Sequence, residues 1–226
     1  MTALDAGRAP VQKVVRQSSG DQVAAHIRRL IFSGALRHGD RIRQNDIAQE
    51  LGVSRIPVRE AIIGLEREGW VHVEPHRGAF VLGLDDDGIR DNFDVLGRIY
   101  GLAARRAVVR ADDEAIGQLV ALAKAARSTN DLDELFQTTN AFWRQLFRSA
   151  ASPRLSAIIR VVPALVPDNF FTIGGNAAEV GKRGLAAIAK ALSARDGDAA
   201  AAACIALLEK QADNLVALVA TQAAQP

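Results

Sequence analysis

Hydrophobic residues recur every three or four positions in three short segments of the N-terminal third of the chain. The first segment, SSGDQVAAHIRRLIFSGAL, begins at Ser18 and predicts an amphipathic helix that Gly34 ends. RHGDRI then predicts a turn, and QNDIAQEL, residues 44–51, predicts a short second helix. A third helix is predicted within LGVSRIPVREAIIGLEREGW, residues 51–70, with an inner face formed by Val58, Ile62 and Leu65.

The period of the pattern changes directly after the third helix. WVHVEP alternates apolar with polar residues, HRG predicts a turn, and AFVLGL is apolar again, which together predict a two-stranded hairpin with Gly78 near its tip. The charged, turn-prone LDDDG, residues 84–88, predicts a linker between two domains. Residues 1–17 are polar, small and aperiodic, and predict a mobile arm ahead of a first domain at 18–83.

Helical patterns fill the remainder of the chain, residues 89–222. Apolar residues recur at alternating spacings of four and three near both ends of this region, and no strand-like alternation competes. The exception is VVPALVPDNFFTIGGNAAEVG, where prolines and a Gly-Gly pair predict a loop or short helical turns. The predicted fold class is therefore mainly α: a helix-turn-helix with a hairpin wing, followed by an all-helical bundle.

Composition narrows the class of protein further. The chain has 226 residues, of which 49% are hydrophobic and 24% charged, as in a globular protein with two modest cores. No apolar run reaches the roughly 18 residues that a membrane span needs, and the N-terminus has no apolar secretion segment, so we expect a cytoplasmic protein without a membrane partner. The net charge is only +2, but residues 1–82 hold 12 basic against nine acidic residues.

No motif of an enzyme emerges from the sequence. The single cysteine, Cys204, lies within the apolar stretch AAAACIALL, where burial is expected rather than reactivity. There is no glycine-rich phosphate loop, and no paired carboxylates occur in a plausible setting. We therefore expect neither an enzyme nor catalytic residues.

The start of the third helix carries residues suited to bind DNA. Ser54 is predicted to cap the helix, its hydroxyl accepting a hydrogen bond from a backbone amide near residue 57, while Pro57 itself needs no amide hydrogen in the first turn. Arg55 and Arg59 lie four residues apart and project together. An arginine fork can pair with two guanine acceptors or clamp a phosphate, so this end of the helix suits a DNA groove.

The predicted hairpin extends this surface. Arg77 and Gly78 at its tip form a wing that could approach the minor groove or the DNA backbone. The alternative is that Arg55 pairs with an acid and Arg59 lies on an ordinary solvated surface. The order of helix, helix, glycine turn, arginine-bearing helix and glycine-tipped hairpin favours DNA binding, because it is the order of a winged helix-turn-helix.

The N-terminal third resembles the winged helix-turn-helix of the GntR family of bacterial transcription regulators. The stretch LIFSGALRHGDRIRQNDIAQELGVSRIPVREAIIGLEREGWVHVEPHRGAFV follows the family pattern almost throughout, although Ile56 stands where threonine is common. The resemblance implies a homodimeric repressor on a palindromic double-stranded operator, associated with the nucleoid when bound. It places the DNA contacts on residues of the third helix, the wing and the start of the second helix: Ser54, Arg55, Pro57, Arg59, Arg77, Gly78 and Asn45.

The helical region is similar to the effector domain of the FadR-like (FCD) branch of that family. In that branch a helical bundle encloses a cavity for a small molecule, often an organic acid, and many members bind a divalent metal there through an aspartate and three histidines. Here Thr139 or Asn140 falls at the aspartate position, Trp143 at the first histidine and Leu185 at the next. All histidines lie before residue 77, so we expect no metal and no cofactor.

The resemblance also suggests residues for an effector site. Arg98 could bind a carboxylate, although an exposed ion pair is an equal alternative. Thr139, Asn140 and Trp143 could line an apolar pocket with an orienting polar group, or Asn140 could bond a neighbouring helix while Trp143 fills the space of the metal. Two functions stay open for this region: binding of a small organic-acid effector, or dimerisation alone. The sequence identifies neither the effector nor the operator.

Overall fold

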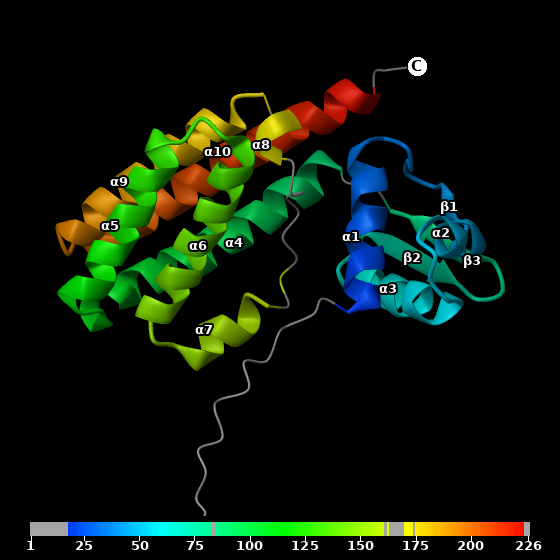
Figure 1. The fold of residues 1–226 in the computed structure, drawn as a ribbon, viewed down its shortest axis with the longest axis horizontal. Coiled ribbons are helices and arrows are strands. Elements are labelled where there is room, and N and C mark those ends of the chain that lie inside the picture. Colours follow the sequence, from blue (N-terminus) through cyan, green and yellow to red (C-terminus); the bar gives the residue numbers. More distant parts are fainter. Residues whose placement is uncertain (1–17, 83–84, 161, 163–169, 174, 224–226) are drawn as a thin grey trace, which may run out of the picture.

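The chain forms an N-terminal body of helices and a small sheet, followed by a body made only of helices (Figure 1). The computed structural model describes residues 18–82, 85–160, 162, 170–173 and 175–223. The N-terminal body contains α1 (Ser19–Phe32), β1 (Arg41–Ile42), α2 (Gln44–Glu50), α3 (Arg55–Arg67), β2 (Val71–Glu74) and β3 (Gly78–Val81). The helical body contains α4 (Asp86–Arg110), α5 (Asp113–Ser128), α6 (Leu132–Ser149), α7 (Pro153–Ile158), α8 (Phe170–Ile173), α9 (Ala177–Ser193) and α10 (Gly197–Ala223).

Helix α1 covers the inner face of α3, as the spacing of its apolar residues predicts. The helix starts with reciprocal hydrogen bonds: the Ser18 hydroxyl accepts from the Asp21 amide, and the Asp21 carboxylate accepts from the Ser18 amide, both at 3.1 Å. Apolar side chains of α1 and α3 are fully or almost fully buried where the two helices pack, among them Val23, Ile27, Val58, Ile62 and Leu65. This packing fixes α3 while its outer face stays open to solvent.

The wing is a three-stranded sheet, so the predicted two-stranded hairpin was incomplete. The strand order is β1-β3-β2 with antiparallel pairing, and Arg41 and Ile42 of β1 lie opposite Phe80 and Ala79 of β3. Residues 41–42 had been assigned to a turn. Backbone bonds from the Gly39 amide to Val81 and from the Val81 amide to Asp40 extend this pairing. A strand of two residues is too short to show alternation in the sequence.

The predicted linker was wrong at its C-terminal end, because α4 already begins at Asp86. The Asp85 carboxylate accepts a hydrogen bond from the Gly88 amide at 2.7 Å, and two further aspartates lie in the first turn. Acidic side chains stabilise the N-terminus of a helix through its dipole. The three consecutive aspartates of the predicted linker therefore begin a helix. Residue 84 of that linker and the arm at residues 1–17 lie outside the described residues.

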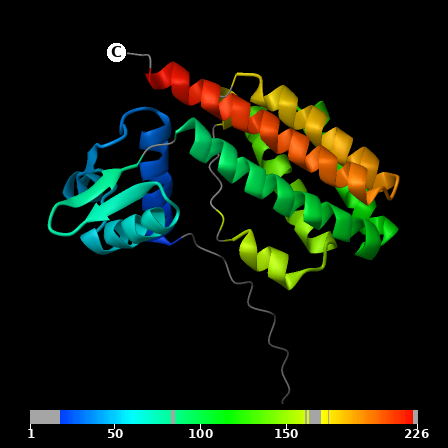
Figure 2. The same cartoon turned by 180° about the vertical axis from the view of Figure 1, so that it is seen from behind.

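In the helical body, α4 and α10 lie side by side along most of their length (Figures 1 and 2). A Cβ atom added at Gly101 would lie 3.2 Å from the carbonyl oxygen of Ala201, and one at Gly97 would lie 3.3 Å from the Cα of Ile205. Side chains at these two positions would therefore push the helices apart. Helix α9 packs on α10 and α5, and α6 packs on α5 and α4.

The segment with prolines and the Gly-Gly pair, residues 161–181, falls partly outside the described residues. Its described part contains the single turn α8 and the start of α9, so one of the predicted short helical turns is present. Within the described ranges, no helix is both long and apolar enough to cross a membrane. The fold class predicted from the sequence, mainly α with a small wing, is confirmed.

Candidate DNA-binding surface and ligand cavity

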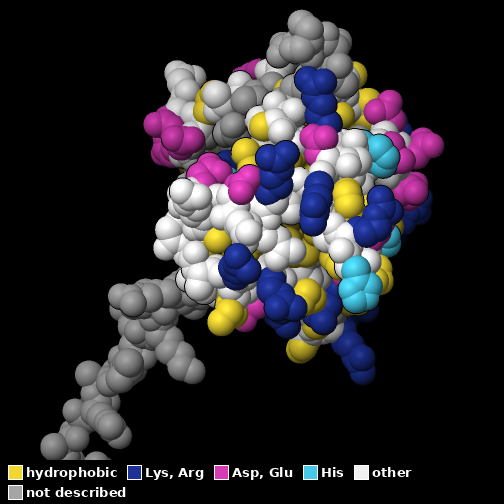
Figure 3. Space-filling model, turned by 90° about the vertical axis from the view of Figure 1, so that its right-hand side faces the viewer, with side chains coloured by type: hydrophobic (Ala, Val, Ile, Leu, Met, Phe, Trp, Pro, Cys, Tyr) yellow, Lys and Arg dark blue, Asp and Glu magenta, His cyan; other side chains and the backbone are white. Residues whose placement is uncertain are grey.

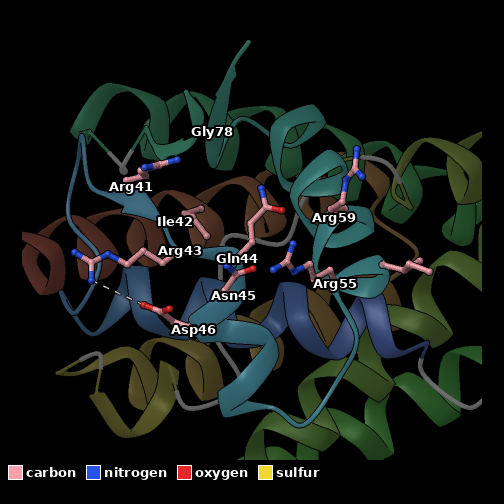
Figure 4. A pocket seen from close by; sticks show the side chains of 10 residues that line it. Arg41, Ile42, Arg43, Gln44, Asn45, Asp46, Arg55, Arg59 and Gly78 are labelled. Carbon is pink, nitrogen blue, oxygen red and sulfur yellow. Dashed lines mark ion pairs between the residues drawn. The ribbon is translucent and has the colours of Figure 1, made fainter. Parts of the chain in front are cut away.

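A hollow of about 670 Å³ opens on the N-terminal body between β1, the starts of α2 and α3, and the start of β3 (Figure 4). We call it the basic hollow, because it contains four arginines and a single acid. It is lined by Arg41, Ile42, Arg43, Gln44, Asn45, Asp46, Arg55, Ile56, Arg59 and Gly78. Arginine side chains recur across this end of the molecule (Figure 3). An open, basic surface of this kind suits a polyanion.

The structure brings together Arg55, Arg59 and Asn45, three of the residues predicted to contact DNA (Figure 4). Neither arginine has an acidic side chain within ion-pair distance among the residues that the structure describes. Their charge is therefore available to a ligand, and the alternative of an Arg55 ion pair finds no support. Between them in the sequence, Ile56 also lines the hollow, and its apolar side chain is 68% exposed.

The predicted cap of α3 was wrong in its chemistry. Ser54 is the N-cap residue, but its side chain makes no capping hydrogen bond. The third residue of the helix is Pro57, which has no amide hydrogen to donate, so the usual partner of a capping hydroxyl is missing. The Ser54 hydroxyl and the first amides of α3 consequently have hydrogen-bonding capacity for an outside acceptor such as a phosphate.

Of the two predicted wing residues, Gly78 lines the basic hollow, and Arg77 precedes it in the chain. Arg77, in the turn before β3, pairs with the Glu74 carboxylate, and its guanidinium carbon lies 5.7 Å from the centre of the Phe80 ring. Gly78 has a φ of 111°. A Cβ atom there would lie 3.1 Å from Nε of Arg41, so the glycine leaves room for that arginine as well as for an approaching ligand.

Sequence reasoning missed Arg41 and Arg43, which lie in β1 and directly before α2. The only signal was the basic RIR triplet ahead of the second helix. This triplet alone does not predict a position beside α3, because that position depends on the pairing of β1 with β3. Arg43 lies 3.9 Å from Asp46, and both side chains are mostly exposed. Pairs of this kind are weak, so the Asp46 carboxylate leaves Arg43 available to a stronger anion.

A second site lies between the helices of the helical body. We call it the aromatic cavity, a space of about 140 Å³ between α4, α6, α8, α9 and α10. It is lined by Phe93, Leu96, Tyr100, Phe136, Thr139, Asn140, Trp143, Phe170, Phe171, Gly181, Leu185, Leu207, Leu208 and Gln211. Tyr100 stacks on Trp143 with ring centres 4.5 Å apart. Three predicted effector residues, Thr139, Asn140 and Trp143, thus share one cavity, and Trp143 does not fill it.

Arg98, the fourth predicted effector residue, is not among the residues that line the aromatic cavity. It is exposed on α4, where its Nε donates a hydrogen bond to Asp94 at 3.0 Å. This hydrogen bond raises the pKa of the guanidinium above its usual value. The geometry supports the ion-pair alternative for Arg98 and gives no support to its role in effector binding.

The residues of the aromatic cavity do not fit the metal of the FCD branch. The oxygen and nitrogen donors that line it are hydroxyl and amide groups, from Tyr100, Thr139, Asn140 and Gln211, together with the indole of Trp143. Divalent transition metals prefer imidazole, thiolate or carboxylate ligands. In the described part of the chain, no three histidine, cysteine, aspartate or glutamate side chains are grouped to hold an ion. Absence of a metal remains a prediction for metal analysis.

Comparison with known proteins identifies the family to which this chain belongs. The pattern of "Bacterial regulatory proteins, gntR family" matches residues 19–81, and that of the FCD domain matches residues 91–210. The chain belongs to the GntR family of transcriptional regulators. Within this family, it is 34% identical over 197 residues to an uncharacterised HTH-type transcriptional regulator of Mycobacterium tuberculosis, covering 87% of this chain and 81% of the relative.

Two further proteins resemble this chain in part of the sequence or in fold. The gluconate operon transcriptional repressor of Bacillus subtilis is 38% identical over 86 residues, which span 38% of this chain and 35% of the repressor. The solved structure of E. coli McbR/YncC covers 92% of this chain and all of its own, with a TM-score of 0.65 and 18% identity. At this identity the structural likeness establishes the fold alone.

Proposed function

We propose that this protein is a homodimeric transcription repressor that binds a palindromic DNA operator and releases it when a small molecule occupies the aromatic cavity. The observation that carries the DNA-binding part is the basic hollow, in which Arg55 and Arg59 have no acidic partner within the described residues. The protein would act in the cytoplasm, at the nucleoid, as a regulator without enzymatic activity. Its relatives in the GntR family are transcriptional regulators.

In this proposal α3 enters the major groove with its N-terminal end. Arg55 and Arg59 pair with guanine edges or phosphates, and the free Ser54 hydroxyl donates to a phosphate at the first turn. The exposed Ile56 side chain lies between the arginines and contacts thymine methyl groups. Arg41 and the wing residues around Gly78 follow the adjacent backbone, because the wing and the hollow share one surface.

The second copy would bind along α4. Three apolar residues of this helix, at intervals of seven, remain exposed to 47%, 39% and 83%: Val95, Leu102 and Val109. Two helical turns take about 7.2 residues, so these side chains lie on one side of α4, which runs along the open face in Figure 2. A self-complementary interface produces two-fold symmetry, and a two-fold dimer requires a palindromic operator.

Sedimentation tests the proposed dimer surface. Leu102→Glu should convert a dimer into monomers, because charge is placed in the middle of the apolar stripe. Val120→Glu is the matched control, since Val120 is similarly exposed, at 37%, but lies on α5. The dimer surface is refuted if the unmodified chain sediments as a monomer, or if both variants dissociate equally.

Operator binding tests the DNA-binding surface. With a sequence selected from random DNA, Arg55→Ala should lose about 1–3 kcal/mol of binding free energy in a salt-controlled titration. Arg67→Ala provides the control, because Arg67 is exposed at the opposite end of the same helix. Unchanged affinity of the Arg55 variant, or equal losses in both variants, would show that α3 does not read DNA with its N-terminal end.

Release of DNA by a ligand requires that the ligand binds the two arrangements of the DNA-binding heads with different affinities. The competing proposal gives the helical body only a role in dimerisation. The aromatic cavity, a mostly apolar space with a few polar groups, favours a ligand over dimerisation alone. If no small molecule raises the melting temperature of the protein, the helical body is a dimerisation module.

A further inference from the structure

Among the described residues that line the aromatic cavity, none carries a charged side chain. Six aromatic rings contribute to its wall, from Phe93, Tyr100, Phe136, Trp143, Phe170 and Phe171. Burial raises the pKa of the Tyr100 hydroxyl to about 12, so this group is neutral at physiological pH. A carboxylate in this space would lose its hydration without meeting a cation, which is strongly unfavourable.

An arginine on α4, Arg98, does not offset the free-energy cost of burying a carboxylate in the cavity. Arg98 is two residues from each of the lining residues Leu96 and Tyr100, a little over half a helical turn away. It faces solvent and forms an ion pair with Asp94. Its side chain is 71% exposed. The organic acid expected from the family resemblance therefore has no electrostatic partner in the cavity.

Among the described residues of the wall, one polar atom is fully buried and lacks a hydrogen-bond partner. The Thr139 hydroxyl is buried and has no hydrogen-bond partner, although its residue lines the cavity. Gln211 is already engaged: its Nε2 donates to the Ala177 carbonyl at 3.0 Å, and its Oε1 accepts from Asn214 at 3.0 Å. A buried hydroxyl without a partner costs free energy, and a ligand that supplies a partner recovers it.

The volume limits the size of that ligand. The cavity measures about 140 Å³, close to the roughly 150 Å³ of an apolar protein cavity that accommodates benzene. The stacked pair of Tyr100 and Trp143 presents flat surfaces, and aromatic rings pack favourably against such surfaces. Size and shape together fit one aromatic ring.

We propose that the aromatic cavity binds a neutral molecule with one aromatic ring and one hydrogen-bonding group, such as a phenol, with that group bonded to Thr139. The ligand replaces the metal-bound organic acid of the family. This proposal refines the effector part of the proposed function.

The test uses three probes of similar size on the full chain: phenol, toluene and benzoate. Binding is followed by the indole N–H signal of Trp143 in NMR spectra, which Trp143→Phe distinguishes from the signal of the other tryptophan in the chain. Phenol should shift this signal at the lowest concentration, toluene at a higher one, and benzoate should bind most weakly.

Thr139→Val then tests the hydrogen bond. The substitution preserves shape and removes a hydroxyl without a partner, so the protein should stay folded. Affinity for phenol should fall about two- to tenfold, while affinity for toluene should not fall. Thr138→Val is the matched control, because Thr138 precedes Thr139 on α6 but does not line the cavity.

Several outcomes would overturn the proposal. These are benzoate binding as tightly as phenol, no shift of the Trp143 signal with any probe, and a shift produced by equimolar zinc. Equal effects of the two valine substitutions, or equal weakening of phenol and toluene by Thr139→Val, would do so as well. None of these titrations contains DNA, so their failure is distinct from a failure of operator binding.

Discussion

The basic hollow and the aromatic cavity differ in almost every physical property. The hollow is open, contains four arginines and one aspartate, and leaves Arg55 and Arg59 without acidic partners in the described chain. The cavity is smaller, lies between helices, has six aromatic rings in its wall, and contains no charged residue among its described lining residues. In the proposed function, each site would recognise its ligand by what it leaves unsatisfied: positive charge in the hollow, and apolar surface with the buried Thr139 hydroxyl in the cavity.

The largest effect is expected from removing both unpaired arginines of α3. Arg55→Ala combined with Arg59→Ala should weaken operator binding at least about 30-fold, because each arginine that pairs with a base contributes about 1–3 kcal/mol. Phenol binding, followed at Trp143, should remain unchanged, because neither arginine lines the cavity. Fluorescence anisotropy with labelled operator measures the first effect. Loss of both activities would mean that the two sites are not physically separate.

A smaller effect is expected from crowding the interface between α4 and α10. Gly101→Ala should lower the free energy of unfolding by about 1–3 kcal/mol, since its Cβ would lie 3.2 Å from the Ala201 carbonyl oxygen. Gly117→Ala is the control. No atom lies within 4 Å of a Cβ there, and alanine favours a helix over glycine by about 1 kcal/mol. Urea unfolding of both variants measures the difference, and equal stabilisation would contradict the close approach.

The smallest effect concerns Ile56, the apolar residue of the hollow. Ile56→Ser should cost about 0.8 kcal/mol for each thymine methyl group that it contacts. Replacing the contacted thymine of the operator by deoxyuridine removes the same methyl group. The two changes should therefore not add in a double-mutant cycle measured by anisotropy. Full additivity at every thymine of the operator would exclude the contact.

The hollow was largely predictable because its central residues lie in one short motif. The spacing of Arg55 and Arg59 on α3 follows from the sequence alone. The contribution of Arg41 does not, because β1 has two residues and gains its place only by pairing with β3. The predicted Ser54 capping hydrogen bond is absent because Pro57, the third residue of α3, has no amide hydrogen to donate to it.

The cavity was predictable on α6 and at one position of α9. Asn140 and Trp143 of α6 and Leu185 of α9 were placed at the effector site by the family resemblance, and the structure puts all three in the wall. The residues from α8 and α10 join them only through tertiary packing, which has no local sequence signal. Arg98 was also mispredicted because its orientation depends on packing. Its neighbour Gly97 is buried, but the Arg98 side chain extends into solvent instead of into the cavity.

Parallel selection of bound sequences from random DNA, with the unmodified chain and with Arg55→Ala, tests the reading of DNA by α3 most directly. The unmodified chain should enrich a palindrome, and the variant should lose base preference at one symmetric pair of positions while retaining the rest. Identical enriched sequences from both proteins, or no enriched sequence from the unmodified chain, would contradict a recognition surface built on Arg55.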